Sequence, residues 1–156
     1  MSGIRIHLKN DIWTSQTSQV IDTTFYLENY GEFFPDDQWT DLTYPVIDIW
    51  AQQIISYKNN PSGKVELFFM DGPYKLIVRK TTVDMLAVQC VNFRDQPLCE
   101  MEFECSYRDF FDMLLVAVKD LDRILYEHEL NGKQIREVRA QLRWLRSRLR
   151  EEILRC

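Results

Sequence analysis

The hydrophobic pattern has a period of two between Lys64 and Ser106, which predicts β-strands. From Cys99 to Cys105, thiol and apolar side chains alternate with three glutamates, so we expect one dry face and one face that carries carboxylates. The turn sequences Asp71-Gly72-Pro73 and Arg94-Asp95-Gln96-Pro97 separate further alternating runs. Turn residues between alternating runs are typical of hairpins. This part of the chain therefore predicts a four-stranded antiparallel β-meander.

A helical period replaces this pattern on both sides of the meander. Apolar residues recur at intervals of three and four from Tyr107 to Leu125, which predicts a helix with one broad apolar stripe. Ser106 and Asp109 have the spacing of a capping box at its start. The range Thr43–Lys58 has a similar stripe and predicts a second helix. Pro45 does not argue against it, because a proline in the first turn of a helix is tolerated. We expect these helices to cover the dry face of the sheet.

The N-terminal part is less regular. Ile4–Leu8 and Val20–Leu27 alternate like strands, whereas Tyr30–Trp39 mixes aromatic and acidic residues and is interpreted as a loop. The whole pattern predicts one α+β domain over residues 1–156. We expect an antiparallel β-meander of four to six strands packed by helices, with a long C-terminal helical hairpin.

The last segment, from Gln134 to Arg155, has apolar residues at nearly heptad spacing. Such a narrow stripe fits one partner surface. The simpler interpretation is that this helix folds back on the preceding one through the Asn131-Gly132 turn. Alternatively, the stripe forms a contact between two copies of the chain, so that the protein is either a monomer or a homodimer. The contact residues would then be Val138, Leu142, Trp144, Leu145 and Leu149.

Charge divides the chain into two unequal parts. Residues 1–130 carry 11 Lys and Arg against 21 Asp and Glu, while residues 131–156 carry eight Lys and Arg against three Glu. The overall net charge of −5 therefore combines an acidic body with a basic C-terminal helix. Such asymmetry bears on partners and not on the fold. Because the acidic body repels phosphates, we expect no nucleic-acid partner.

The lengths of the apolar runs indicate where the protein resides in the cell. A bilayer span needs about 20 apolar residues, and the longest runs, such as Met113–Val118, are far shorter. The N-terminus alternates apolar and polar residues and lacks the apolar core of a secretory signal. We therefore expect a cytoplasmic protein without a membrane partner.

No catalytic or cofactor signature occurs in the sequence. His7 and His128 lie outside metal-binding patterns, and the four cysteines lack CxxC spacing. Free thiols are therefore expected, with Cys90, Cys99 and Cys105 in buried strand faces and Cys156 accessible. No glycine-rich phosphate loop is present. The acidic pair Asp36-Asp37 and the row Glu100, Glu102 and Glu104 are more simply solvent-facing than catalytic. Cross-strand partners for this row could come from Lys75, Arg79 and Lys80. The sequence thus predicts a protein that is no enzyme and holds no cofactor or metal.

The stretch from Glu28 to Trp50 contains six Asp and Glu, no Lys or Arg, and several aromatic residues. Carboxylates steer a basic partner over long distances, and aromatic side chains supply binding energy once it has docked. The stretch therefore predicts a protein-binding surface. In the alternative interpretation the aromatic residues belong to the core and the acids form an ordinary solvated edge. The predicted partner-binding residues are Glu32, Phe33, Phe34, Asp36, Asp37, Trp39 and Asp41.

Two short runs carry a resemblance to a known class of proteins. Trp39-Thr40-Asp41-Leu42 precedes a helix that contains Trp50, and Glu66–Tyr74 ends in Asp-Gly-Pro-Tyr. Over about residues 39–130 the chain resembles small bacterial immunity proteins of polymorphic-toxin and contact-dependent-inhibition systems. The resemblance implies a non-catalytic cytoplasmic protein that binds and blocks one cognate toxin. If that toxin is a nuclease, its phosphate-binding cleft is basic. The alternative function is a structural or regulatory homo-oligomer assembled through the C-terminal helix.

Overall fold

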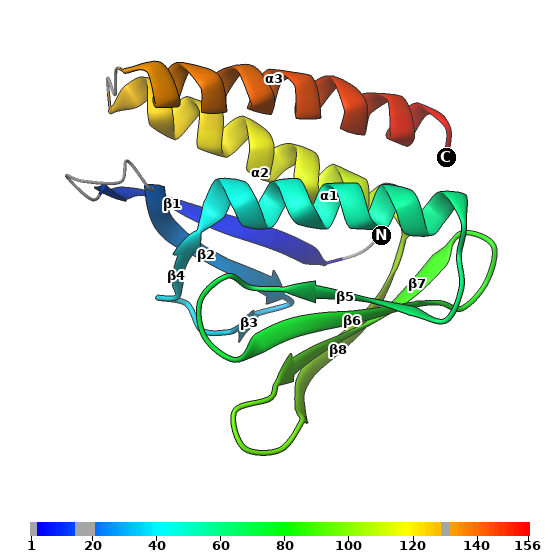
Figure 1. Cartoon of the computed structure of the whole chain (residues 1–156). Helices are drawn as coiled ribbons and strands as arrows, with labels where there is room; N and C mark the ends of the chain where they lie inside the picture. The colour runs from blue at the N-terminus through cyan, green and yellow to red at the C-terminus, as the bar shows by residue number, and fades with distance from the viewer. Residues whose placement is uncertain (1–2, 15–20, 129–131) are drawn as a thin grey trace.

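Two antiparallel sheets and three helices make up the described part of the chain (Figure 1). The computed structural model describes residues 3–14, 21–128 and 132–156. In chain order the elements are β1 (Ile4–Thr14), β2 (Ile21–Asn29), β3 (Glu32–Phe34), β4 (Thr40–Leu42), α1 (Thr43–Asn59), β5 (Lys64–Phe68), β6 (Tyr74–Lys80), β7 (Met85–Asn92), β8 (Leu98–Ser106), α2 (Tyr107–Glu127) and α3 (Lys133–Leu154).

The strands are divided between two sheets of four. β1, β2 and β3 are neighbours in the first sheet, where β4 also pairs with β2, and β5 to β8 form the second sheet in sequence order. The predicted meander and the α+β class are therefore confirmed. The division itself was not predicted. It coincides with α1, which lies between β4 and β5 in the chain, and no described strand of the first set pairs with a strand of the second.

Near the N-terminus the elements differ from the expectation in length. β1 continues to Thr14 because its pairing with β2 resumes after an irregularity between Leu8 and Ile12. The predicted loop over residues 30–39 contains the short strand β3, which pairs with β2. Val20, the predicted start of the second strand, lies outside the described residues.

Helix α1 supplies the centre of the core. Trp50 is 0% exposed, and its ring packs edge-on against Phe25 of the first sheet and against Phe69, with centroid distances of 5.6 and 5.1 Å. Its indole N–H donates to the Phe68 carbonyl at 2.8 Å. Burial of an aromatic side chain of this size is among the largest single contributions to a core. Trp50 thus joins α1 to both sheets.

Helices α2 and α3 form the predicted hairpin and run antiparallel along each other (Figure 1). The predicted cap is present, because the Ser106 hydroxyl accepts from the Asp109 N–H at 3.0 Å. Of the turn Asn131-Gly132, Asn131 lies outside the described residues. Nowhere in residues 3–14, 21–128 or 132–156 is there a helix of sufficient length and apolarity to cross a membrane.

The packing of α3 decides between the two interpretations of its apolar stripe. Leu142, Leu145 and Leu149 are 0% exposed within the single chain, and Val138 packs partly buried against the core. Their proposed role in a contact between copies is therefore wrong, because α2 already covers them. Trp144 is the exception, with 53% of its surface exposed.

The four cysteines divide into two kinds. Cys90 and Cys105 are buried, whereas Cys99 and Cys156 are exposed. The expectation that Cys99 lies in a buried strand face is wrong, because the pairing of β7 with β8 shifts between Cys90 and Val91 and interrupts the alternation there. Burial raises the pKa of the Cys90 thiol, and it raises the pKa of the Cys105 thiol to about 12.

We expect thiol labelling to reproduce this division. Only a thiolate reacts readily with an alkylating reagent, and burial disfavours both the thiolate and access to it. N-ethylmaleimide should therefore add two groups to the native protein, at Cys99 and Cys156, and four after denaturation. Mass spectrometry of the labelled peptides measures this. Rapid native labelling of Cys90 or Cys105 would contradict the packing of the second sheet.

Candidate functional site

The two sequence runs that carry the resemblance meet in space. The Trp39 ring lies against Gly72, where a β-carbon would come within 2.6 Å of it. Gly72 also has a positive φ of 68°, which favours glycine. The ring of Tyr74 packs edge-on against Trp39 at a centroid distance of 4.9 Å. The turn between β5 and β6 is thus fastened to the segment that leads into β4.

Asp41 of β4 is the polar centre of this junction. It is 0% exposed, and its carboxylate accepts from the backbone N–H groups of Leu42, Met70 and Asp71 at 2.7, 3.2 and 3.3 Å. The indole N–H of Trp39 donates to it at 3.1 Å. Burial raises the pKa of the Asp41 carboxyl, and the hydrogen bonds from Trp39, Leu42 and Asp71 oppose that rise. Asp41 therefore holds the two sheets together.

This junction corrects the predicted partner-binding surface. The expected exposure of Asp41 is wrong, and so is that of Phe34, which is 0% exposed between the rings of Phe69 and Tyr74. Pairing of β3 with β2 places Phe34 opposite buried Leu27. Trp39 is only partly buried and packs against the core.

The other predicted residues of this stretch remain on the surface. Phe33 is 44% exposed, and Glu32, Asp36 and Asp37 are exposed as well. Phe33 packs edge-on against Tyr26 at 5.6 Å. Asp36 has a local role, because its carboxylate accepts from the Gln38 N–H at 2.8 Å and shapes the turn.

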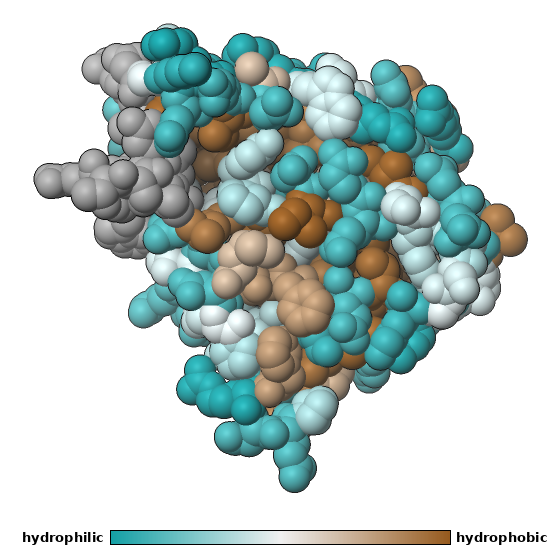
Figure 2. All heavy atoms as spheres, in the orientation of Figure 1, coloured by the Kyte–Doolittle hydropathy of each residue, from teal (hydrophilic) through white to brown (hydrophobic). Residues whose placement is uncertain are grey.

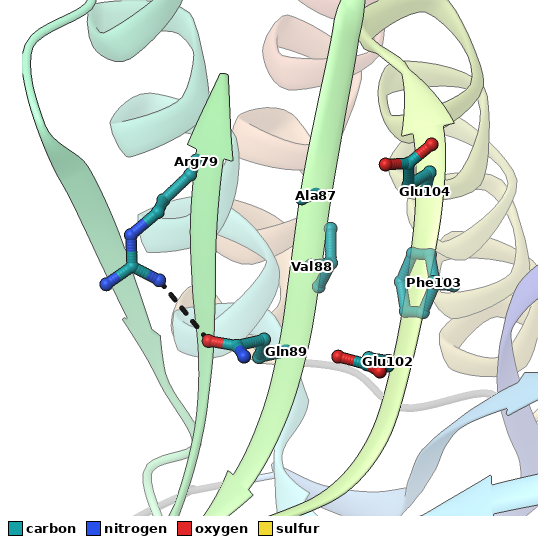
Figure 3. Close-up of a pocket in the computed structure, with 7 residues that line it drawn as sticks. All are labelled: Arg79, Ala87, Val88, Gln89, Glu102, Phe103 and Glu104. Carbon is teal, nitrogen blue, oxygen red and sulfur yellow. Dashed lines mark hydrogen bonds between the residues drawn. The ribbon is translucent and has the colours of Figure 1, made fainter. Parts of the chain in front are cut away.

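Glu32 lies in a groove with the glutamates of β8. The groove encloses about 360 Å³ and is lined by Glu32, Glu100 and Glu102, together with Cys99 and Met101. A second hollow of about 430 Å³ shares Glu102 and adds Glu104 (Figure 3). Residues from the edges of both sheets thus form one surface. We call it the acidic strip and define it as Glu32, Glu100, Glu102 and Glu104.

The cations of the same sheet are engaged elsewhere. Lys64 and Lys75 pair with Glu66 at 3.3 and 3.2 Å, and Arg79 donates to Gln89 at 3.3 Å (Figure 3). The expectation that Lys75, Arg79 and Lys80 pair with the glutamate row is wrong, because β7 lies between β6 and β8. Arg79 nevertheless lines the same hollow as Glu102 and Glu104. Within the described ranges, the carboxylates of the acidic strip form no ion pair.

The outer face of the second sheet also carries aromatic side chains, at the opposite edge from the acidic strip. Phe68 is 41% exposed and packs edge-on against Phe93 at 6.0 Å. Lys75 lies over both rings, with its Nζ at 5.5 and 5.3 Å from their centroids. Figure 2 shows apolar residues gathered near α1 and β5, where Ile49 and Phe68 are exposed.

Part of this site had a signal in the sequence. The alternation of Glu100, Glu102 and Glu104 predicted a carboxylate face. The exposure of Phe68 was not predicted. Nothing in the sequence indicated that Glu32 lies near β8, because this proximity depends on contact between the two sheets.

No group of three or more His, Cys, Asp or Glu in the described portion of the chain could hold a metal ion. Comparisons of the chain with models of protein families, with curated proteins and with solved structures find no match. The functional argument therefore depends on the geometry and charge of the surface.

Proposed function

We propose that this chain is a non-enzymatic protein that binds a basic protein partner through the outer face of the second sheet. The observation that carries the proposal is the acidic strip, whose carboxylates come from two sheets and form no ion pair among the described residues, while one cation, Arg79, lines the hollow beside Glu102 and Glu104. Like charges held side by side destabilise a free protein. Lysine or arginine side chains of a partner would relieve this repulsion.

The remainder of the face suits the same role. Exposed Phe68 and partly buried Phe93 lie at its other edge, and aromatic side chains that lose water on docking provide much of the energy of protein interfaces. The acidic strip accelerates the encounter with a basic surface, and the aromatic edge stabilises the docked complex.

The most concrete form of the proposal is toxin neutralisation by a bacterial cytoplasmic immunity protein. It is supported by the resemblance of the Trp39–Leu42 and Glu66–Tyr74 runs to immunity proteins and by their contact in the fold. A nuclease toxin has a basic cleft for phosphates, and a carboxylate surface could occupy that cleft in place of nucleic acid.

The gene immediately upstream provides the test. We expect it to encode a toxin whose isolated toxic domain stops bacterial growth, and we expect co-expression of this chain to restore growth. The purified pair should form a complex that weakens as salt is raised, because exposed charges are screened. Growth arrest that persists on co-expression, with no complex by size-exclusion chromatography, would exclude toxin neutralisation of that partner.

A further inference from the structure

The exposed face of α3 carries a line of arginines. Arg136, Arg143 and Arg150 are exposed, and each follows the previous one by seven residues, which is nearly two turns of a helix. They therefore lie along about 21 Å of α3, and we call them the arginine row. Trp144, which is 53% exposed, follows Arg143 in the chain. The face thus combines positive charge with an aromatic side chain.

The acids of α3 do not neutralise the arginine row, because each pairs with a different cation. These pairs join Glu137 to Lys133, Glu151 to Arg148, and Glu152 to Lys58, Arg148 and Arg155. On α2, Asp122 pairs with Arg139 at 2.8 Å. Within the described ranges the arginine row forms no ion pair. Its charge is therefore available to a partner.

The middle of this face permits a close approach. Helical spacing places Ala140 and Ser147 between the arginine row and Trp144, and both are exposed. Their short side chains leave the helix backbone accessible between the arginines and the indole. Tryptophan and arginine are also the residues most enriched at positions that dominate the energy of protein interfaces. The face therefore suits contact with another protein surface of opposite charge.

The acidic strip provides such a surface. Glu100, Glu102 and Glu104 follow one another along β8 at intervals of about 7 Å, and Glu32 lies in the groove beside them. The arginine row has intervals of about 10 Å, a difference that long arginine side chains can bridge. Both sets of charges lack an ion pair among the described residues.

The hollow beside the acidic strip suits Trp144. Its floor includes Ala87, which pairs with Arg79 of β6 on one side and with Glu104 of β8 on the other (Figure 3). The small side chain of Ala87 leaves room above the sheet. An indole that lay there would contact the guanidinium of Arg79, and a cation beside an aromatic face is attracted to it.

The two complementary surfaces lie on opposite sides of the molecule. Helix α3 packs against α2 and α1 at one side, whereas β8 lies at the other side, beyond these helices (Figure 1). The arginine row therefore cannot reach the acidic strip of its own chain. It can reach the acidic strip of a second copy.

We propose that the arginine row and Trp144 of one copy dock on the acidic strip of a second copy, with the indole over Ala87. The contact joins two different faces, so a pair keeps one free row and one free strip, and further copies can add. Contacts of this size are at the weak end of protein interfaces. The inference goes beyond the proposed function, because no toxin takes part.

Sedimentation velocity of the full chain tests the proposal. At about 20 mM sodium chloride, where screening is weak, the weight-average mass should rise with protein concentration and pass that of a dimer. At about 500 mM the chain should be a monomer. A monomer at low salt up to about 300 µM protein, or an assembly that salt does not weaken, would overturn the proposal.

A charge exchange between two variants identifies the faces. Arg143→Glu/Arg150→Glu makes the row acidic, and Glu102→Lys/Glu104→Lys makes the strip basic, at positions that are exposed. Each variant alone should be monomeric at low salt, because its two faces carry like charges. An equimolar mixture should associate again, because each face then meets its opposite. A mixture that stays monomeric would overturn the pairing of these faces.

Two further variants separate the contact from net charge. Arg108→Glu/Lys119→Glu changes the net charge as much as Arg143→Glu/Arg150→Glu does, at exposed positions on α2, and should associate almost as the wild type does. Its loss of association would overturn the proposal. Trp144→Ala should weaken association about tenfold and leave the melting temperature nearly unchanged. Unchanged association would overturn the docking of the indole.

Vesicles of phosphatidylserine and phosphatidylcholine distinguish a membrane from a second copy. A chain that is monomeric at low salt but sediments with these vesicles, and loses this binding in Arg143→Glu/Arg150→Glu, would assign the face to a lipid surface and overturn the proposal. These measurements contain no toxin, so their failure is distinct from a failure of toxin neutralisation.

Discussion

Replacement of Asp41 by alanine should lower the free energy of unfolding by about 3 kcal/mol, because four N–H donors lose their acceptor in a buried site. Three of these donors are backbone groups, at Leu42, Met70 and Asp71, and the fourth is the indole of Trp39. A domain of this length should then melt about 6–12 °C lower. Urea unfolding followed by tryptophan fluorescence measures the change.

Two other variants control for the loss of charge and for shape. Asp37→Ala removes an exposed carboxylate a few residues away and should change the stability by less than about 0.5 kcal/mol. Asp41→Asn keeps one acceptor oxygen and the size of the side chain, so it should fall between the wild type and Asp41→Ala. If Asp41→Ala were as stable as Asp37→Ala, Asp41 would not be the link between the sheets.

Reversal of charge on the acidic strip should slow association with the upstream-encoded toxin by about tenfold to a hundredfold at low salt. The double variant Glu102→Lys/Glu104→Lys replaces two exposed carboxylates, so its fold and melting temperature should be close to those of the wild type. Stopped-flow fluorescence at several salt concentrations measures the association rate. The difference between variant and wild type should shrink as salt is raised, because screening removes steering.

The matched control for this experiment is Asp112→Lys/Glu137→Lys, which changes net charge equally at exposed positions on α2 and α3. It should slow association far less. Equal slowing by both variants would mean that net charge acts, and not the acidic strip. A third variant, Asp36→Lys/Asp37→Lys, tests the turn after β3. If this variant alone slowed association, the docking surface would lie at that turn and not on the second sheet.

The features that could be predicted from the sequence are those with a local period. The meander, α1, α2 and the Ser106 cap depend on neighbours in the chain, so their patterns were readable. The cis packing of α3 was the simpler of two interpretations of its stripe, and the burial of that stripe within one chain decides for it. The division into two sheets leaves no periodic trace, because it depends on which strands stay unpaired: β4 pairs with β2 and not with β5.

The candidate site was harder to predict for the same reason. Phe33 and Phe34 are adjacent aromatic residues in one acidic stretch, yet strand geometry places one outside and one in the core. Asp41 is as acidic as the exposed Asp36 and Asp37, and the N–H groups of Met70 and Asp71 that help to satisfy it when buried are distant in the chain. Glu152 likewise belongs to an arginine-rich helix in which most charged side chains are exposed. It is nevertheless buried, and Lys58 of α1 pairs with it.

The contact between Trp39 and Gly72 has a consequence for how the molecule comes apart. The indole covers the turn between β5 and β6, and the same turn is bonded to Asp41 of β4. Neither sheet can therefore open at this point while the other stays intact. The two sheets, although they share no ladder, should lose their structure together, as one cooperative unit.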